Sequence, residues 1–271
     1  MNKINIGITG STGSLGKELL KFRREFNFIS YKDDIRSKKK LKTWFEKNSF
    51  DAIFHLAAIV PIKEVNKNRD KALNVNFFGT KNIVEEVVSN NIKWFFFSST
   101  SHVYSTSKKK INEKFKLKPI SFYGKTKKLA EEYIIRSFKK TNTPYCIGRI
   151  FSTTNKSQKE NYLVPDLKKR IKNSNTKILL KNLNHYRDFI SLNDLSRIII
   201  RLYKKKFNGI INLGSGKSIH LKKIALIIAK KYKKNLKFED NKVSTSLIAD
   251  VSKMKKFCKY RLSKKIETQI F

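Results

Sequence analysis

A tyrosine and a lysine four residues apart, Tyr123 and Lys127, are the side chains of this sequence best suited to acid–base chemistry. Residues at this spacing lie on one face of a helix. The lysine ammonium can then lower the pKa of the phenol and hold the ribose of a cofactor, so that the tyrosine gives or takes a proton near neutral pH. A hydroxyl at the end of a neighbouring strand, supplied by Thr100, would polarise the substrate oxygen beside that phenol.

The Tyr-x-x-x-Lys spacing alone decides nothing, because lysine is abundant. It occurs three times, at Tyr104/Lys108, Tyr123/Lys127 and Tyr260/Lys264. The first pair stands in a polar, lysine-rich stretch without helical periodicity, and the last has no strand and no hydroxyl before it. Only the middle pair opens a convincing helix, predicted over 121–139.

The stretch that must position a cofactor beside these residues is Lys3–Leu20, which reads as strand, glycine-rich turn and helix. Gly10 permits a tight turn, Gly13 lets a pyrophosphate approach the backbone, and Gly16 lets the helix pack closely. The helix N-terminus offers N–H groups and a positive dipole end to phosphates. We therefore predict a dinucleotide site here, with the remaining turn residues Thr12, Ser14 and Leu15 included in it.

Strands and helices alternate along the rest of the chain. This order predicts an α/β fold, a Rossmann-type doubly wound parallel sheet with a small C-terminal substrate-binding region. Expected strands cover 26–31, 51–58, 93–98, 144–150, 176–181, 209–213 and 236–239, and expected helices cover 69–90, 121–139, 161–173 and 220–232, with another helix capped by Asn193 or Asp194. The expected domains are 1–160 for the dinucleotide, to which 186–215 return, and 161–271 mainly for substrate.

The composition is extreme in charge, with 61 Lys and Arg against 21 Asp and Glu and a net charge of +40. Because the lysines are scattered through every segment, a codon bias is favoured over a dedicated polyanion-binding role, and no specific nucleic acid is expected. Cys146 and Cys258 fit neither a disulfide framework nor a metal site. No apolar run reaches membrane-spanning length and no leader precedes the first strand, which predicts a cytoplasmic protein without a membrane partner.

Several spaced motifs resemble the extended short-chain dehydrogenase/reductase family. They are TGSTGSLG, HLAA, NVNFFGT, FFSSTSHVY, YGKTK and RDFISLNDL, and they occur in the family's order over nearly the whole chain. The resemblance implies an NAD(P)-dependent enzyme of polysaccharide biosynthesis that acts on a nucleotide-activated sugar, as a 4-keto reductase or an epimerase, and a homodimer. It implies Tyr123 as acid/base, Lys127 as its partner and Thr100 as the hydroxyl, with Ser99 as the alternative.

The resemblance also implies which residues bind the cofactor and the substrate. Besides the glycine turn, Tyr123 and Lys127, the cofactor residues are Lys32, Asp34, Ile35, Leu56, Ala57, Ala58 and Asn76; the substrate residues are Ser101, His102, Tyr162, Leu163 and Arg187. An NAD site usually offers an acid at the end of the second strand. Here Lys32 stands at that corner and could face a 2′-phosphate, which favours NADP.

Some assignments stay open. Arg187 either binds the substrate diphosphate or forms a surface ion pair with Asp188 or Asp194, and His102 either moves a proton or only forms hydrogen bonds. Family dehydratases carry Asp-Glu directly after the catalytic hydroxyl, where this chain has Ser101-His102, so dehydration is disfavoured. Family epimerases often carry Asn where Ser152 stands. An alternative of a different class is a catalytically silent Rossmann protein that binds RNA or another polyanion.

Overall fold

The computed structural model describes residues 3–155, 158, 162–174, 178–240, 243–262 and 270. The chain forms two compact units: the first comprises Met1–Ser105, Lys116–Ile150 and Ser196–Ile211, and the second comprises Thr106–Phe115, Phe151–Leu195 and Asn212–Phe271. These boundaries differ from the expected 1–160, 186–215 and 161–271. Residues 106–115 join the second unit because their backbone pairs with it, as in the hydrogen bonds from Ser107 N to Ser246 O and from Ile111 N to Ile248 O.

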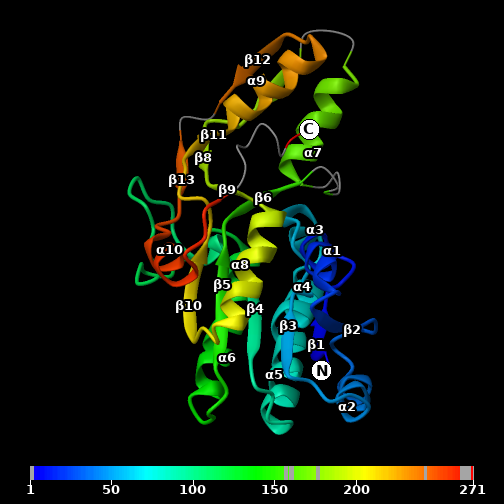
Figure 1. Cartoon of the computed structure of the whole chain (residues 1–271). Helices are drawn as coiled ribbons and strands as arrows, with labels where there is room; N and C mark the ends of the chain where they lie inside the picture. The colour runs from blue at the N-terminus through cyan, green and yellow to red at the C-terminus, as the bar shows by residue number, and fades with distance from the viewer. Residues whose placement is uncertain are drawn as a thin grey trace. The chain divides into compact units, whose positions relative to one another are not determined.

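The first unit is built on a six-stranded sheet in the order β10–β5–β4–β3–β1–β2. The strands are β1 (Ile4–Thr9), β2 (Phe26–Tyr31), β3 (Ala52–His55), β4 (Phe95–Thr100), β5 (Tyr145–Ile150) and β10 (Gly209–Leu213). The pairs from β2 to β5 are parallel, and Figure 1 shows β1, β3 and β4 side by side. The predicted Rossmann-type sheet is confirmed. Since β2 and β3 flank β1 on opposite sides, the carboxyl ends of β1 and β3 form the switch point where such sheets bind ligands.

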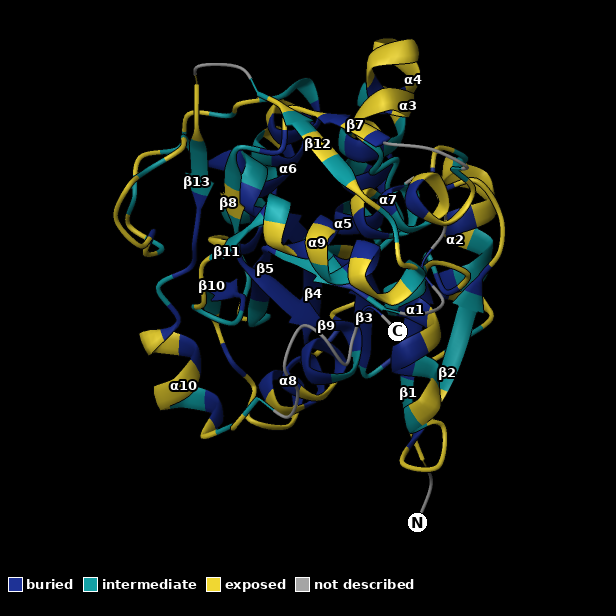
Figure 2. Ribbon diagram, turned by 90° about the horizontal axis from the view of Figure 1, so that it is seen from above, coloured by how far each residue is buried: buried dark blue, intermediate teal, exposed yellow. Residues whose placement is uncertain are grey.

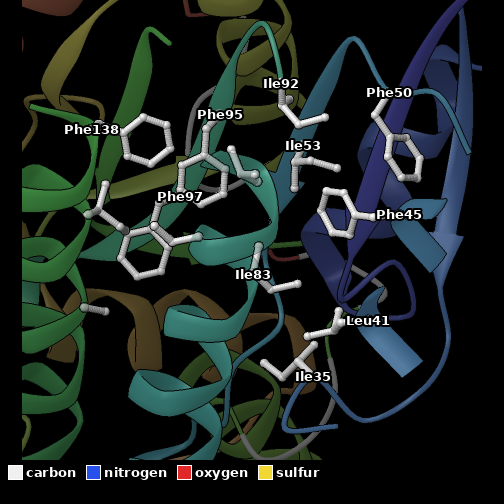
Figure 3. Packing of buried hydrophobic residues seen from close by; sticks show 14 of the residues in the cluster. Ile35, Leu41, Phe45, Phe50, Ile53, Ile83, Ile92, Phe95, Phe97 and Phe138 are labelled. Carbon is white, nitrogen blue, oxygen red and sulfur yellow. The ribbon is translucent and has the colours of Figure 1, made fainter. Parts of the chain in front are cut away.

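Both faces of this sheet are apolar, which explains why its strands read as continuous apolar runs. On one face, Ile53, Phe95 and Phe97 pack in a buried cluster with side chains of the covering helices (Figure 3). Strand alternation places Phe54 and Phe96 on the other face, where their rings lie 6.0 Å apart. Figure 2 accordingly shows β4 and β5 as buried.

The helices of the first unit connect these strands. They are α1 (Ser14–Leu19), followed by a 3-10 turn at Leu20–Phe22, α2 (Lys38–Glu46), α3 (Ile62–Lys67), α4 (Arg69–Leu73), α5 (Thr80–Ser89) and α6 (Phe122–Phe138), with α8 (Leu192–Lys204) beginning in the second unit. The single helix expected over 69–90 is interrupted by a π-helical turn at Asn74–Gly79, which separates α4 from α5. Such turns occur often at functional sites.

The described part of the second unit contains small sheets and, besides the start of α8, three helices. Its strands are β6 (Ser152–Thr154), β7 (Ile178–Lys181), β8 (His185–Arg187), β9 (Phe189–Ser191), β11 (Ile219–His220), β12 (Leu236–Glu239) and β13 (Thr245–Leu247), and its helices are α7 (Leu163–Lys172), α9 (Leu221–Tyr232) and α10 (Ser252–Cys258). β7 pairs with β12, β6 with β9, and β8 with β11 and β13. A separate apolar core joins α7 and α9.

Three expected boundaries need correction. The strand expected over 51–58 ends at His55, and the strand expected over 93–98 runs instead from Phe95 to Thr100, because pairing with β5 continues through Thr100. The helix expected to be capped by Asn193 or Asp194 is α8, preceded by Ser191, whose Oγ accepts the Asp194 N–H at 2.9 Å. Residues 161 and 176–177 of the expected helix and strand lie outside the described residues.

Candidate active site

The glycine turn after β1 is as tight as the sequence requires. Gly10 has φ +73°, and a Cβ there would lie 2.7 Å from the Ala57 nitrogen. A Cβ on Gly16 would collide with the backbone of Gly10 and Ser11, so only glycine lets α1 pack this closely. A Cβ on Gly13 would meet only the Gly10 oxygen at 3.2 Å, which leaves the outer side of this residue accessible. Thr12 is exposed, and Ser14 and Leu15 are half-buried.

The end of β4 places Ser99 and Thr100 in different surroundings. Ser99 Oγ donates a hydrogen bond to the buried Glu131 carboxylate of α6. Thr100 Oγ1 instead accepts the His102 N–H at 3.3 Å and so caps the 3-10 turn Ser101–Val103. This engagement of Ser99 supports Thr100, rather than the alternative hydroxyl, as the group that faces a ligand.

Helix α6 presents Tyr123 and Lys127 on one buried face. Ser121 begins the helix, since its Oγ accepts the Gly124 N–H at 3.1 Å. Gly124 lets the helix lie against the His102 backbone, and the rings of His102 and Tyr123 are 6.0 Å apart. Lys127 is 1% exposed, and its Nζ lies 4.0 Å from the centre of the Phe97 ring of β4. The structure thus gathers Thr100, His102, Tyr123 and Lys127 in the first unit.

Burial strongly affects Lys127. Desolvation lowers the pKa of its ammonium to about 7, and the charge of Glu131, one helical turn further on, opposes that shift. Glu131 is itself held by Arg149, with Nη2 to Oε2 at 2.7 Å, and Arg149 Nη1 donates to Tyr104 Oη at 2.8 Å. Tyr104, expected in a polar stretch, is therefore a fully buried part of this network.

The segment after β3 lies against the glycine turn. Leu56, Ala57 and Ala58 are each half-buried. Asn76, from the π-helical turn, is fully buried and clamps the next residue, Ile59: its Oδ1 accepts the Ile59 N–H at 2.8 Å and its Nδ2 donates to the Ile59 oxygen at 3.0 Å. Asn76 thus shapes this segment from the interior of the protein.

The corner after β2 is a set of local ion pairs. Asp34 and Arg36 are joined by several hydrogen bonds, with Nη2 to Oδ2 at 2.5 Å, and Asp33 accepts from Lys40 at 2.6 Å. Lys32 is exposed and forms no ion pair with a described residue. The Ile35 side chain is buried in the core, so only its backbone remains for contact with an adenine.

The second unit holds the other residues expected to bind substrate. Arg187 donates to the Tyr186 oxygen at 2.8 Å and to Thr245 O and Oγ1 at 3.0 Å. Neither Asp188 nor Asp194 is bonded to it in the described part of the chain, so the surface ion pair considered for Arg187 is absent there. Tyr162 precedes α7 and is half-buried, and Leu163 is exposed.

Comparisons with known proteins identify the family. The model of the GDP-mannose 4,6 dehydratase family matches residues 8–269. The chain belongs to the nucleotide-sugar epimerases and dehydratases of the extended short-chain dehydrogenase/reductases. GDP-6-deoxy-D-talose 4-dehydrogenase of Aggregatibacter actinomycetemcomitans is 30% identical over 226 residues, which is 79% of this chain and 75% of that protein.

Two solved structures share the fold of this short-chain dehydrogenase/reductase. RMD from Pseudomonas aeruginosa, complexed with NADPH, superposes with a TM-score of 0.89 at 16% identity, over 99% of this chain and 96% of that one. UDP-glucose 4-epimerase of Thermus thermophilus, complexed with NAD, superposes with a TM-score of 0.88 at 16% identity, over 98% and 96%. These structures show the same fold, and the family model together with the 30% identical relative confirms the recognised family of NAD-dependent enzymes acting on nucleotide sugars.

Two polar features of this family member were missed at the level of sequence. One is the Ser99–Glu131–Arg149–Tyr104 network, for which the only local signal was a glutamate four residues after Lys127. The other is His55, a polar residue at the end of the apolar strand β3.

Among the described residues, no helix is long and apolar enough to cross a bilayer, and no three His, Cys, Asp or Glu side chains are grouped as metal ligands.

Proposed function

We propose that this chain is an NAD(P)-dependent enzyme that reduces a 4-keto nucleotide sugar or epimerises such a sugar, with Tyr123 as the proton donor and acceptor. The observation that carries the proposal is the buried Lys127 one turn along α6 from Tyr123, beside the strand that ends in Thr100. The similarity to a GDP-sugar 4-dehydrogenase supports chemistry at C4, because reduction of a 4-keto sugar is the reverse of 4-dehydrogenation.

The residues present fit a dinucleotide. The turn at Gly10–Gly16 leaves backbone accessible for a pyrophosphate at Gly13, and the first turn of α1 follows it. The nicotinamide, when bound, supplies or accepts the hydride. Lys127 binds the ribose, the Leu56–Ala58 segment forms a wall beside it, and Asn76 contributes by holding that segment through Ile59.

The proton chemistry falls to the chain's own side chains. Tyr123 donates its phenolic proton to the sugar oxygen as the carbon beneath it is reduced, and takes a proton back in the reverse direction. Thr100 donates a hydrogen bond to the same oxygen. A charged Lys127 stabilises the phenolate left on Tyr123. We assign Ser101 and His102 to the sugar, with Tyr162 and Leu163 as further substrate residues, and Arg187 to the diphosphate, since no carboxylate of the described residues neutralises its charge.

Epimerase and reductase are separated by isotope exchange at the sugar. The wild-type enzyme is incubated with a 4-keto nucleotide sugar in deuterated water without reduced cofactor, and C3 and C5 are followed by NMR. If the wild-type enzyme exchanges hydrogen for deuterium at C3 or C5 and His102→Ala does not, His102 is a second acid/base and the protein is an epimerase–reductase. We expect no exchange in this incubation, and reduction of the sugar once reduced cofactor is added, because a 4-keto reductase needs only Tyr123. A wild-type enzyme that neither catalyses exchange nor reduces the sugar with either reduced cofactor would contradict the proposed function.

We propose a preference for NADP, set by Lys32. The acids of that corner, Asp33 and Asp34, are engaged by Lys40 and Arg36, which leaves Lys32 for a 2′-phosphate. NADPH is expected to bind about two- to fivefold more tightly than NADH, the range of an exposed ion pair. Lys32→Ala should weaken NADPH only, whereas the control Lys42→Ala on α2 should change neither. A clear preference of wild type for NADH would show that Lys32 is only a solvated charge.

A homodimer remains part of the proposal. Phe78 of the π-helical turn and Leu129 of the neighbouring α6 are large apolar side chains that are 45% and 41% exposed. Covering them would remove apolar surface from water. The mass of the purified protein in solution, measured by light scattering, tests this expectation, and a monomer at all concentrations would contradict it.

A further inference from the structure

His55 is a fully buried imidazole at the end of β3, and both of its ring nitrogens are hydrogen-bonded. Its Nδ1 lies 2.6 Å from Thr9 Oγ1, and its Nε2 lies 2.9 Å from Thr80 Oγ1. Thr9 is the neighbour of His55 in the parallel register of β1 and β3, at the switch point of the sheet. The proposed acid–base chemistry makes no use of this ring, so its polar contacts require another explanation.

The direction of each hydrogen bond follows from the number of protons available. The Thr80 hydroxyl has one proton, which it donates to the Asn76 carbonyl at 2.8 Å, so it can only accept from His55. His55 therefore carries its proton on Nε2. Neutral imidazole then accepts at Nδ1, which makes Thr9 the donor, and the Thr9 hydroxyl oxygen remains to accept the Ala57 N–H at 3.3 Å.

A neutral ring also agrees with its surroundings. The ring stacks on Phe97, with centroids 5.7 Å apart, and Lys127 Nζ lies over that same Phe97. Burial, and then the charge of Lys127, lower the pKa of His55 to about 3. A protonated His55 would place a second cation in the same dry region as Lys127, where no described carboxylate contacts the ring.

These bonds link the two halves of the cofactor site. On one side, the Thr9 carbonyl oxygen accepts the Leu56 N–H, and Thr9 Oγ1 accepts the Ala57 N–H. These two bonds fix the segment that lies against Gly10. On the other side, Thr80 is the first residue of α5, which packs against α6. The imidazole fills the space between these two threonines, and a glutamine, with both polar atoms at one end, could not bond in both directions.

We propose that His55 is a positioning residue, which as the neutral Nε2–H tautomer holds the cofactor-facing segment Leu56–Ala58 at a fixed place relative to the helices that carry Tyr123 and Lys127. It does not touch substrate or move a proton. The inference rests on the proposed function in one respect, because its consequence is measured as cofactor affinity.

The first test is spectroscopic and needs no cofactor. The chain has four histidines, so nitrogen-15 labelling of histidine with long-range proton–nitrogen correlation can resolve each ring, and loss of one set of signals in His55→Phe assigns His55. We expect a protonated Nε2, an accepting Nδ1, and no titration from about pH 5 to 8, the range where exposed histidines change charge. An Nδ1–H tautomer, or titration within that range, would overturn the proposal.

The second test measures the affinity for NADH and NADPH by fluorescence in three variants. His55→Phe keeps the ring stacked on Phe97 but removes both hydrogen bonds, and Thr9→Val and Thr80→Val each remove one link at nearly constant volume. Each is expected to weaken binding about tenfold, which corresponds to about 1.4 kcal/mol. Thr43→Val is the matched control, because its hydroxyl also bonds a carbonyl four residues earlier in a helix, at 3.1 Å, outside this network.

The outcomes separate this inference from the proposed function. Wild-type protein that binds neither NADH nor NADPH would overturn the proposed function and the role of His55 with it. Wild-type protein that binds cofactor, together with network variants that bind it equally well, would overturn the positioning role alone. Weaker binding in all three variants but not in Thr43→Val, with the neutral Nε2–H signature in wild type, would establish it; if His55→Phe does not fold, the two threonine variants carry the test.

Discussion

Tyr123→Phe is expected to reduce turnover by about 10²- to 10⁴-fold, the usual contribution of a general acid–base group. The substitution removes only the phenolic hydroxyl and keeps the ring that packs near His102 and the apolar side chains of α3 and α4. Cofactor affinity should therefore stay within about twofold of wild type, because the loss falls on the proton transfer. Turnover is measured as oxidation of reduced cofactor by a 4-keto nucleotide sugar.

Two further tyrosines give this experiment its controls. Tyr133→Phe lies on the same helix, and its hydroxyl donates to Glu85 of α5 at 3.3 Å, away from Thr100 and Lys127, so near-normal turnover is expected. Tyr104→Phe tests the rival Tyr-x-x-x-Lys pair. Loss of the Tyr104 hydroxyl would remove a hydrogen-bond acceptor from Arg149. We therefore expect a lower thermal stability, with turnover much less affected than in Tyr123→Phe. Equal losses from Tyr104→Phe and Tyr123→Phe would contradict the assignment of Tyr123.

The parts of the fold that the sequence predicted well are those in which a local pattern has one physical solution. An apolar strand followed by this glycine pattern permits the tight turn that is observed, because a Cβ at Gly10 or Gly16 would collide with the backbone. Helix α6 begins within one residue of the prediction because Ser121 caps it and its apolar spacing is regular. The parallel sheet followed from apolar strands that alternate with helices.

The rest depends on contacts between distant parts of the chain. Tyr104 looked like part of a polar loop because its partner, Arg149, is 45 residues away. The interleaved units were equally hidden, since residues 106–115 join the second unit through backbone pairing with residues around 246–248. Backbone pairing of this kind leaves no trace in side-chain periodicity. The roles of Thr100, Tyr123 and Lys127 themselves stay predictions, which the geometry supports by bringing the residues together.

Lys127→Met is expected to make the protein more stable and less active. The folded protein holds the pKa of Lys127 at about 7, below its ordinary value of 10.5, because burial disfavours the charge. Between these two pH values the unfolded chain binds more protons than the folded one, so the stability of wild type rises with pH in that window. Below about pH 7 both states carry the proton, and the full cost of burying the charge applies.

The difference between the variant and wild type should therefore depend on pH. Methionine fills similar space without a charge, so Lys127→Met should exceed wild type by several kcal/mol in free energy of unfolding near pH 6, at about 1.4 kcal/mol per pKa unit, and the gap should narrow toward pH 9. Urea unfolding of both proteins from pH 6 to 9 measures this difference in stability. Lys125 is exposed on the same helix, so the control Lys125→Met should show a difference from wild type that does not change with pH. Parallel stability curves for Lys127→Met and wild type would contradict a buried charge. A more stable variant with lost turnover would mean that the cost of burying Lys127 is retained for catalysis, since a lysine of purely structural use would not destabilise the fold it belongs to.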